Sequence, residues 1–564
     1  MDNYFLKAFY HAHDDLSLEA SILYAPGADR HYMERWQHSG WTKKTGGTGV
    51  NLAAYWDTAF GLLSQRLTYK RIQGSRTKEQ MASGKWWMSS PDKDWAGPRS
   101  WATEGGRGEQ HQAEQNWSYS AKMDWQTWHW GAVAHRLQTG LELAHTHVYY
   151  RRPQRYEHYN EYVKNTDNCI DPSGNEDFST CSLTTPYYES TWAGQFFNTR
   201  TVYHPGKLTV NNYRYALFMQ DELQFNRLSA TLGLRYQTEQ LTANNTLAPR
   251  SSVRWDIWGD QQTQIEAGAN RYYGGSLYTY QLSVKQRDFF EAQERDTMQD
   301  PWRRRYPTNN FMRHSQLKSP YDDELVLGLQ QQALGHQWRL QWVKRQGRDQ
   351  VALKSQVDPL DANKSVSYFY NGGRSQAETL TLSVETQTPY QLAASQTHAF
   401  FALDKLHITS DHETYDTTLE SLGERRLIRY NGQIMREGEQ PVSNFNRPWS
   451  ARLLLNTEIE AWNLTIGNFF RYRAAYREVV RTGRIRHAEQ WISDYQTYRF
   501  PSAFTWDLTT TYDLPITSSQ SLFTTLSVTN VLNKRIPVAY GDEDSFGRVY
   551  DAGRQLWVEL GYRF

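Results

Sequence analysis

Long apolar runs are absent from this sequence of 564 residues, whose mean hydropathy is −0.80. A transmembrane helix needs about twenty consecutive, mainly apolar residues, so the sequence excludes a helical membrane protein. The formal net charge is only +1, and no long run of like charges occurs. A nucleic-acid-binding protein is therefore not expected, and we predict no nucleic acid among the partners.

Cysteine is also scarce, because the chain has only Cys169 and Cys181, which lie close together in its most polar stretch, residues 150–208. Two thiols without further ligands at metal-binding spacing do not make a zinc site. Chains that are exported to an oxidising compartment use such pairs as disulfides. The pattern predicts a Cys169–Cys181 disulfide and no metal site. The acidic residues nearby do not have the spacing of an EF-hand loop, so we expect a solvated loop there.

Catalytic motifs and domain linkers are missing as well. The sequence has no Gly-x-Ser-x-Gly elbow, no His-Glu-x-x-His segment and no Gly-rich phosphate loop. It also has no linker rich in Pro, Gly or Ser and no repeat of solenoid or propeller period. We therefore expect one continuous domain over residues 1–564, which is not an enzyme and has no cofactor.

Alternation of apolar and polar residues is what the sequence has instead, and it is clearest at the end of the chain. Leu556, Val558, Leu560, Tyr562 and Phe564 fall on one face of an extended segment. The intervening positions are mostly polar, so the segment is suited to a wall between lipid and water. A strand that is apolar outward and polar inward is the repeating unit of a transmembrane β-barrel.

The same alternation recurs along the chain, most cleanly over residues 228–237. The 22 Trp and 37 Tyr suit the aromatic girdles that barrels place at both membrane interfaces. The fold class predicted is all-β, an antiparallel transmembrane β-barrel. Further strands are expected at residues 4–12, 16–24, 47–57, 325–331, 378–386, 449–460, 464–472, 505–514 and 521–530.

Short and long connections alternate between these strands, as they do in outer-membrane barrels, where the short turns lie in the periplasm. This order gives about nineteen strands, of which the first and the last both run toward the periplasm. A closed bacterial barrel needs an even number, so we expect an incomplete set that lacks an N-terminal part. Long loops are expected at 25–46, 72–111, 151–208, 275–321, 353–372, 411–447, 478–502 and 535–553.

Two segments near the C-terminus resemble a known family. The segment Asn530-Val531-Leu532-Asn533-Lys534-Arg535 is similar to a signature that follows the penultimate strand of the TonB-dependent outer-membrane receptors. Tyr550-Asp551-Ala552-Gly553-Arg554, followed by the alternating strand to Phe564, resembles the terminal segment of the same family. Residues 233–236 and 5–8 are similar to common strand segments of these receptors.

The resemblance implies a barrel of twenty-two strands around an N-terminal plug, of which this chain would hold the fourth to the last strand. It implies capture of a scarce nutrient complex at the surface of a Gram-negative bacterium, and import driven by the TonB system through the plug. The membrane lipid and lipopolysaccharide would be further partners. Without a plug we expect no transport by this chain alone. The last strand, from Leu556 to Phe564, would be read by the barrel-assembly machinery.

Aromatic and basic residues in one long loop are the first candidates for ligand binding. Rings beside guanidinium groups can hold a planar anionic chelate by stacking and by bidentate hydrogen bonds. The alternative is that the tyrosines continue a strand into the outer girdle, and that the arginines face solvent or lipopolysaccharide. The candidates in this loop are Tyr278, Tyr280, Trp302, Arg303, Arg304 and Arg305.

A second group of candidates is Trp87, Trp95 and Trp101, in the loop of residues 72–111. Dense exposed tryptophans are typical of a contact surface, but the alternative is that they pack the loop internally. The leading ligand class is a ferric siderophore. Haem is an alternative, although the haem-receptor motifs are not found. A passive porin-like channel and a receptor for a protein ligand are further alternatives.

Overall fold

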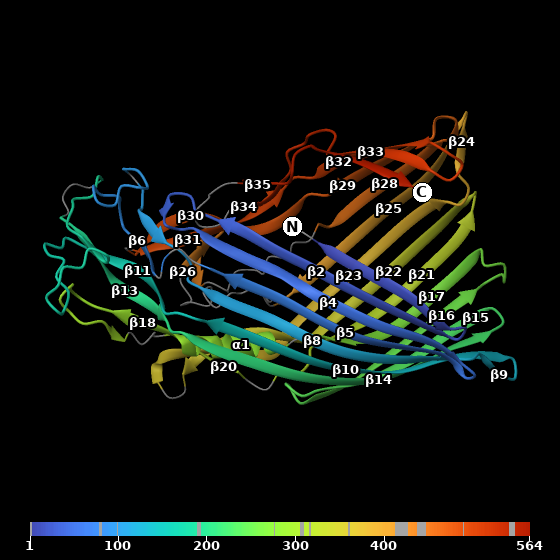
Figure 1. The fold of residues 1–564 in the computed structure, drawn as a ribbon, viewed down its shortest axis with the longest axis horizontal. Helices are drawn as coiled ribbons and strands as arrows, with labels where there is room; N and C mark the ends of the chain where they lie inside the picture. The colour runs from blue at the N-terminus through green and yellow to red at the C-terminus, as the bar shows by residue number, and fades with distance from the viewer. Residues whose placement is uncertain are drawn as a thin grey trace.

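The computed structural model describes residues 3–563 except 78, 79, 81, 99, 189–192, 276, 305–308, 315, 316, 359, 360, 412–426, 437–446, 489 and 541–547. Almost all of the described chain is in strands, which form one tilted wall and a smaller group of sheets at one end of it (Figure 1). No helix in the described part is long and apolar enough to cross a membrane.

Nineteen long strands make the wall, and neighbouring strands in it pair antiparallel. This confirms the predicted fold class and the predicted number. The wall strands are β1 (Tyr4–His13), β2 (Leu16–His31), β4 (Trp41–Thr58), β5 (Gly61–Arg76), β8 (Gln110–Trp125), β10 (Val133–Arg152), β14 (Gly206–Phe225), β15 (Leu228–Glu239), β16 (Asn244–Asp256), β17 (Thr263–Tyr273), β21 (Tyr321–Ala333), β22 (His336–Asp358), β23 (Asp361–Thr386), β25 (Ser395–Ser410), β28 (Trp449–Ile459), β29 (Leu464–Arg473), β32 (Ala503–Pro515), β33 (Ser521–Thr529) and β36 (Gln555–Arg563).

The two edges of this wall are the first and the last strand. Among the described residues, β1 pairs only with β2 and β36 only with β33. Both strands run toward the end with the short turns, as the odd number requires.

Short turns close the wall at one end, shown at the right in Figure 1 near β9 (Trp128–Trp130) and β24 (Tyr390–Leu392). The turn between β21 and β22 places Leu334 at φ 56° and Gly335 at φ 71°. Two consecutive residues at positive φ make a tight hairpin turn that matches the twist of the strands. The long connections lie at the opposite end, which in outer-membrane barrels is the extracellular end.

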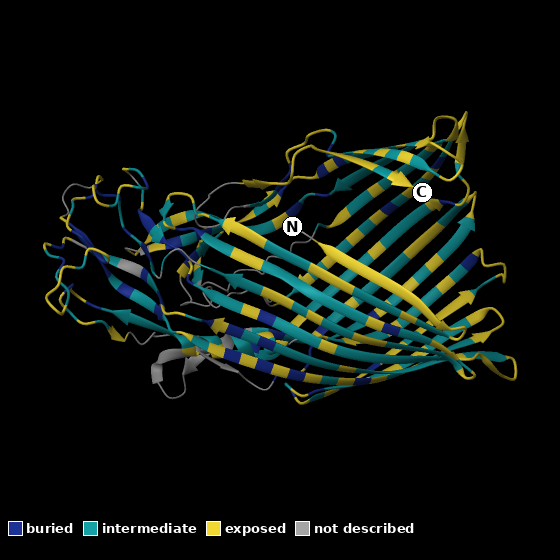
Figure 2. Ribbon diagram, in the orientation of Figure 1, coloured by how far each residue is buried: buried dark blue, intermediate teal, exposed yellow. Residues whose placement is uncertain are grey.

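The two faces of many wall strands differ in exposure, and Figure 2 shows this alternation, whereas the edge strand β1 is exposed at every position. On β14, Tyr213, Tyr215, Leu217 and Met219 are exposed, whereas the residues between them are more buried. These exposed apolar side chains point outward, toward lipid, and the alternate positions point into the lumen.

The long connections at this end contain strands of their own, which were not predicted from the sequence. Residues 353–372 are largely the upper part of a hairpin between β22 and β23. Segments of four other connections pair into a second sheet, which we call the cap sheet. Its strands are β3 (Trp36–Gln37), β6 (Ala82–Lys85), β7 (Thr103–Gly105), β11 (Tyr156–Lys164), β12 (Cys181–Ser182), β13 (Gln195–Tyr203), β18 (Phe290–Glu294) and β19 (Arg303–Arg304).

Two smaller sheets and a few short elements complete the fold. The remaining elements are α1 (Tyr278–Gln286), the 3-10 helices η1 (Arg287–Phe289) and η2 (Glu460–Trp462), β20 (Asn309–His314), the four-stranded sheet of β26 (Leu427–Tyr430), β27 (Gln433–Arg436), β30 (Tyr476–His487) and β31 (Gln490–Phe500), and the pair β34 (Pro537–Tyr540) and β35 (Arg548–Tyr550).

Candidate functional site

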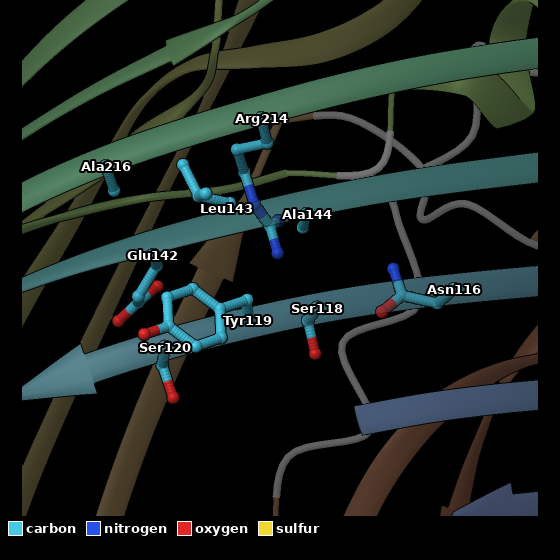
Figure 3. Close-up of a pocket in the computed structure, with 9 residues that line it drawn as sticks. All are labelled: Asn116, Ser118, Tyr119, Ser120, Glu142, Leu143, Ala144, Arg214 and Ala216. Carbon is cyan, nitrogen blue, oxygen red and sulfur yellow. The ribbon is translucent and has the colours of Figure 1, made fainter. Parts of the chain in front are cut away.

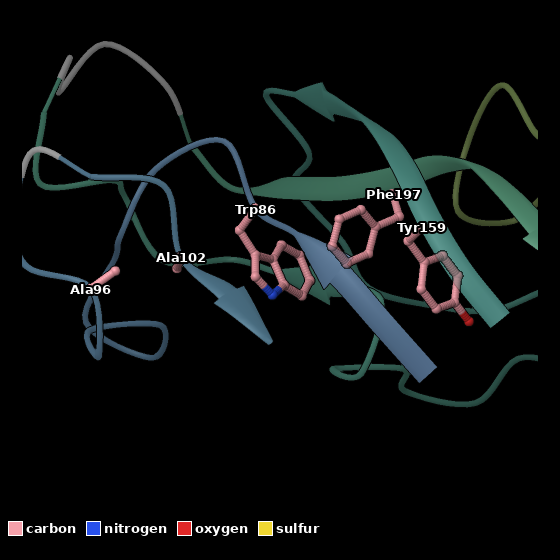
Figure 4. Close-up of a cluster of buried hydrophobic side chains, with 5 residues drawn as sticks. All are labelled: Trp86, Ala96, Ala102, Tyr159 and Phe197. Atoms are coloured by element: carbon pink, nitrogen blue, oxygen red, sulfur yellow. The ribbon is translucent and has the colours of Figure 1, made fainter. Parts of the chain in front are cut away.

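The cap sheet has a core of its own, centred on Trp86. This side chain is fully buried, packs on Phe197 with ring centroids 4.2 Å apart, and donates its indole N–H to Glu104 Oε1 at 2.8 Å. Phe197 in turn stacks on Tyr159 at 5.0 Å (Figure 4). These residues come from two different barrel connections, 77–109 and 153–205, so their packing fixes the two connections to each other.

A second core group surrounds the cysteines. The structure joins Cys169 and Cys181 in a disulfide with Cα atoms 5.5 Å apart, and both cysteines pack with Phe196 and Met298. The neighbouring Arg295 is 2% exposed. Its guanidinium donates to Phe197 O and to Thr180 Oγ1, each at 2.9 Å. Burial lowers the pKa of Arg295 to about 10, which still leaves it charged at neutral pH.

The disulfide loop gives a testable prediction. The bond closes a loop of sequence separation 12, for which the loss of chain entropy predicts about 3 kcal/mol of stabilisation. The double variant Cys169→Ser, Cys181→Ser is therefore expected to lose most hydrogen-exchange protection in this loop. The measurement is hydrogen-exchange mass spectrometry, and the wall strands are the internal control because their protection should not change. Equal protection in the variant and the parent would contradict the prediction.

A carboxylate beside this loop gives a pH prediction. Burial raises the pKa of Asp177, but hydrogen bonds from Ser179 and Thr180 outweigh it and hold the pKa below its ordinary value of 3.8. Because the folded-state pKa is depressed, the stabilisation is fully present above the unfolded pKa and is lost as pH falls through the folded value. We expect proteolysis of the disulfide loop to accelerate below about pH 3.8 in the parent and to depend less on pH in Asp177→Asn. Identical profiles would contradict this.

The three predicted tryptophans of the 72–111 connection all lie in or beside the cap. Trp87 stacks on Tyr162 at 5.3 Å, and Trp95 donates its indole N–H to Thr103 O at 2.7 Å. Trp101 is 39% exposed, with Lys85 Nζ 3.3 Å from its ring centroid. Two of the three therefore pack the loop, and Trp101 is the one with a largely open ring.

Trp302 and the predicted arginines that follow it lie at the edge of the cap sheet. Trp302 is held between two guanidinium groups, with the Cζ atoms of Arg200 and Arg295 at 4.3 and 4.4 Å from its ring centroid. Arg303 forms ion pairs with Glu294 and Asp296, and Arg304 is registered with Gln293. Arg305 lies outside the described residues.

Tyr278 and Tyr280 do not continue a strand into the girdle, as one interpretation of the sequence proposed, because they form the first turns of α1. Tyr280 is buried and contacts Phe369 edge-on at 4.7 Å. Tyr278 donates to Glu114 Oε2 at 2.7 Å. Glu114 lies on β8, whereas α1 follows β17, and four wall strands separate the two. The α1 segment therefore reaches across the inside of the barrel mouth.

Below α1, lumen-facing side chains of neighbouring wall strands form a continuous polar arrangement. A cavity of about 270 Å³ opens on the lumen face of β8, β10 and β14, and Figure 3 shows Arg214 and Glu142 on its wall. Its lining is Asn116, Ser118, Tyr119, Ser120, Glu142, Leu143, Ala144, Arg214 and Ala216.

The arrangement continues from this cavity across five more strands. Arg235 donates to both oxygens of Glu142, at 2.9 and 2.6 Å. Arg345 donates to Glu324 Oε2 at 2.6 Å, and Arg250 Cζ lies 4.9 Å from the ring centroid of Tyr272. We call this set the lumen strip, which comprises Glu142, Arg214, Arg235, Arg250, Tyr272, Asn270, Glu324 and Arg345.

Four arginines face two glutamates in the lumen strip, so its formal charge is positive. The bidentate pair of Arg235 with Glu142 fixes one guanidinium, while Arg214 and Arg250 form no ion pair within the described residues. Fork-shaped guanidinium donors beside an aromatic ring suit an anionic, partly planar ligand. Only Arg235 of this set lies in a strand range named from the sequence, at a polar position of residues 228–237.

The last strand is where the alternation predicted it. Leu556, Val558, Leu560 and Tyr562 of β36 are exposed on one face, and Phe564 lies outside the described residues. The role of this strand in assembly remains a prediction.

No family model matches the chain. A search of curated proteins finds the uncharacterized protein YddB of Escherichia coli K12, 26% identical over 478 residues, which are 82% of this chain and 53% of that protein. The chain thus spans about half the length of the curated relative it matches.

Solved structures of outer-membrane proteins have folds similar to that of this chain. The crystal structure of the outer membrane transporter YddB from Escherichia coli has a TM-score of 0.76 at 20% identity, over 99% of this chain and 68% of that one. A mutant of the ferric enterobactin receptor of Pseudomonas aeruginosa, in complex with enterobactin, has a TM-score of 0.59 at 11% identity, over 100% and 70%.

These likenesses agree with the nineteen-stranded wall, its lipid-facing apolar side chains and the terminal motifs. They confirm the predicted resemblance at the level of fold. The chain has the β-barrel fold that the outer membrane transporter YddB and the ferric enterobactin receptor share.

Proposed function

We propose that this barrel belongs to a receptor that captures a small anionic metal chelate, of the ferric siderophore class, for TonB-driven import. The observation that carries the proposal is the lumen strip. It places unpaired guanidinium groups and a tyrosine ring directly beneath the α1 segment at the extracellular mouth. Ligands of barrels of this size pass through that mouth.

Charge and ring geometry favour a chelate over a neutral solute. Arg250 lies over Tyr272, so a ligand oxygen on the guanidinium would have an aromatic face beside it. The carboxylates of Glu142 and Glu324 hold two further arginines in fixed orientations, which reduces the entropy lost on binding. The comparison with a ferric enterobactin receptor supports the ligand class by analogy of fold alone.

The α1 segment is also compatible with the alternative function, a passive porin-like channel. A loop folded into the mouth is a feature of passive channels too, because it narrows the pore. A passive channel would conduct small solutes without saturation and without preference for a ferric chelate, so binding measurements distinguish the two functions.

The test is the equilibrium binding of a panel of ligands to the purified chain, which is measured by the quenching of tryptophan fluorescence. The panel holds a ferric tris-catecholate, a ferric hydroxamate, ferric citrate and haem, each with its iron-free or gallium form. We expect saturable binding of one anionic ferric chelate that weakens as salt rises. Saturable binding of haem alone, or no saturable binding of any member, would contradict the proposal.

A further inference from the structure

The connection between β29 and β32 folds into the hairpin of β30 and β31, which lies at the end of the wall opposite the short turns (Figure 1). One face of this hairpin is packed. Tyr476 stacks on Phe500 with ring centroids 4.8 Å apart, and Val480 is buried in the same cluster. Tyr476 also donates its hydroxyl to Val538 O at 3.0 Å. The hairpin is therefore anchored through one face, and its other face carries most of its exposed side chains.

A β-bulge in β30 gathers the arginines of this strand on the exposed face. Arg477 and Arg481 precede the bulge at odd positions. Arg484 and Arg486 follow it at even positions, so an unbroken strand would place the two pairs on opposite faces. The pairing with β31 shifts by one residue between Arg481 and Gly483. One extra residue returns the second pair to the face of the first pair.

The bulge is held from the opposite face of the hairpin. Its extra residue, Thr482, donates its hydroxyl to Asp494 Oδ2 at 3.2 Å. Asp494 is 6% exposed and also accepts two hydrogen bonds from Arg429 of β26, at 2.7 and 2.8 Å. Asp494 is paired with Gly483, the neighbour of Arg484, so its carboxylate lies on the face away from the arginines.

Positive charge is therefore concentrated on one face of the hairpin. Glu478, the other carboxylate in the described part of the two strands, follows Arg477 directly and also lies on the opposite face. Arg477 is paired directly with Arg499 of β31, and neither forms an ion pair among the described residues. Like charges directly opposite each other destabilise a sheet, so a partner explains this pair better than stability does. We call Arg477, Arg481, Arg484, Arg486 and Arg499 the arginine face.

The size and the chemistry of the arginine face fit a protein better than a small anion. At about 3.3 Å per residue, the row from Arg477 to Arg486 is roughly 30 Å long, so a small chelate would reach only one or two of its guanidinium groups. Trp491, which is paired with Arg486, is 69% exposed. Arginine and exposed aromatic rings are enriched at protein interfaces. A face of this size suits a transient contact, in which complementary charge sets the association rate.

Arginines elsewhere at the same end of the wall provide an internal contrast. Both oxygens of Asp323 accept from Arg271, at 2.7 and 3.0 Å. Arg348 lies beside the same carboxylate at 3.9 Å. The chain supplies the counter-charge itself there, so a general excess of basic residues at this end does not account for the arginine face.

We propose that the arginine face is a docking surface for an acidic protein outside the cell, a partner distinct from the chelate of the lumen. Carboxylates of the partner pair with Arg477 and Arg499 and relieve the repulsion between them. Trp491 packs against apolar groups of the partner. The contact forms and breaks quickly, because exposed charge pairs are weak one by one.

The test is the binding of a negatively supercharged fluorescent protein to the whole chain in detergent, measured by biolayer interferometry, with the neutral parent of that protein as the reference probe. The double variant Arg477→Gln, Arg499→Gln is expected to bind the acidic probe about ten-fold more weakly, mainly through slower association, since each exposed charge pair contributes up to about five-fold. Arg271→Gln, Arg348→Gln is the matched control, with the same charge change and an expected effect below about two-fold.

Deletion of Thr482 tests the face itself, because it leaves the net charge unchanged. Without the extra residue, Arg484 and Arg486 turn to the opposite face, and binding of the acidic probe is expected to weaken by about ten-fold again. An affinity equal to that of the parent would overturn the proposal. If this variant fails to fold, the comparison of the two double variants decides.

Heparin and a double-stranded DNA oligonucleotide are the further arms, because they carry negative charge without a protein surface. Weaker binding of both than of the acidic probe supports the proposal. Tighter binding of either polyanion, equal binding of the neutral probe, or equal loss in the two double variants would each overturn it.

Discussion

Replacing Trp86 by alanine is expected to cost the cap sheet about 3–5 kcal/mol and to leave the wall folded. Trp86 is fully buried among Ala96, Ala102, Tyr159 and Phe197, so the change opens a cavity that rigid strands cannot fill. It also leaves Glu104 without the indole donor. Because the core joins two connections, both should lose order together. Hydrogen exchange, resolved by peptide, measures this as lost protection in β6, β11 and β13 with unchanged protection in β14.

Trp101→Ala is the matched control for that experiment. It removes the same side chain from the same connection, but Trp101 is 39% exposed and only the Lys85 ammonium lies over its ring among the described residues. The expected cost is below about 1 kcal/mol, the value of an exposed cation–π contact. Equal loss of protection in the two variants would show that Trp86 is not the centre of a packed core.

The second large effect is expected in the lumen strip. The double variant Arg250→Gln, Arg345→Gln should weaken binding of the anionic chelate by at least about 100-fold, since each charge-assisted hydrogen bond contributes about 1.5–3 kcal/mol. Arg250 is already beside a ring, and Arg345 is held by Glu324, so both are oriented before the ligand arrives. The measurement is the titration used for the ligand panel.

Arg254→Gln supplies the control for charge alone. Arg254 lies on β16, four residues from Arg250 and on the same lumen face, but away from the strip toward the periplasmic end. It is expected to change the affinity by less than about three-fold at physiological salt, because its distance from the ligand allows screening. An effect as large as that of the double variant would mean that the strip is not a site but part of a general positive lumen.

The wall could be predicted from sequence because each strand encodes its own two faces. Residues 228–237 alternate locally, and the turns that flank them are local too, so nineteen strands and their directions follow without knowledge of long-range contacts. The odd number of strands was predicted by the same reasoning.

The cap and α1 could not be predicted in this way. The pairing of β6 with β11 and of β3 with β7 joins segments from different connections in parallel, and no local pattern specifies such partners. Tyr278 and Tyr280 belong to a residue type that favours strands, yet packing of Tyr280 on Phe369 and the bond from Tyr278 to Glu114 stabilise a helix. Tertiary contacts outweigh intrinsic propensity there.

The lumen strip was missed for a related reason. Its residues lie at lumen-facing positions of the wall strands. The sequence indicates such positions along every alternating strand, but it does not show which of them contact one another. Which of them meet depends on the stagger between neighbouring strands, as when Arg235 on β15 reaches Glu142 on β10 across β14. Buried Arg295 shows the same limit, because a basic residue in a loop gives no sign that it will join an aromatic core.

The position of the metal in a ligand complex tests the central claim most directly. Crystals of the chain with the ferric chelate that binds in the titration, measured at the iron absorption edge, would locate the iron by its anomalous signal. We predict an iron peak in the barrel mouth, next to Arg250 and Tyr272 and beneath α1. A peak on the outer surface of the cap sheet, or no peak in crystals of the saturated protein, would contradict the account.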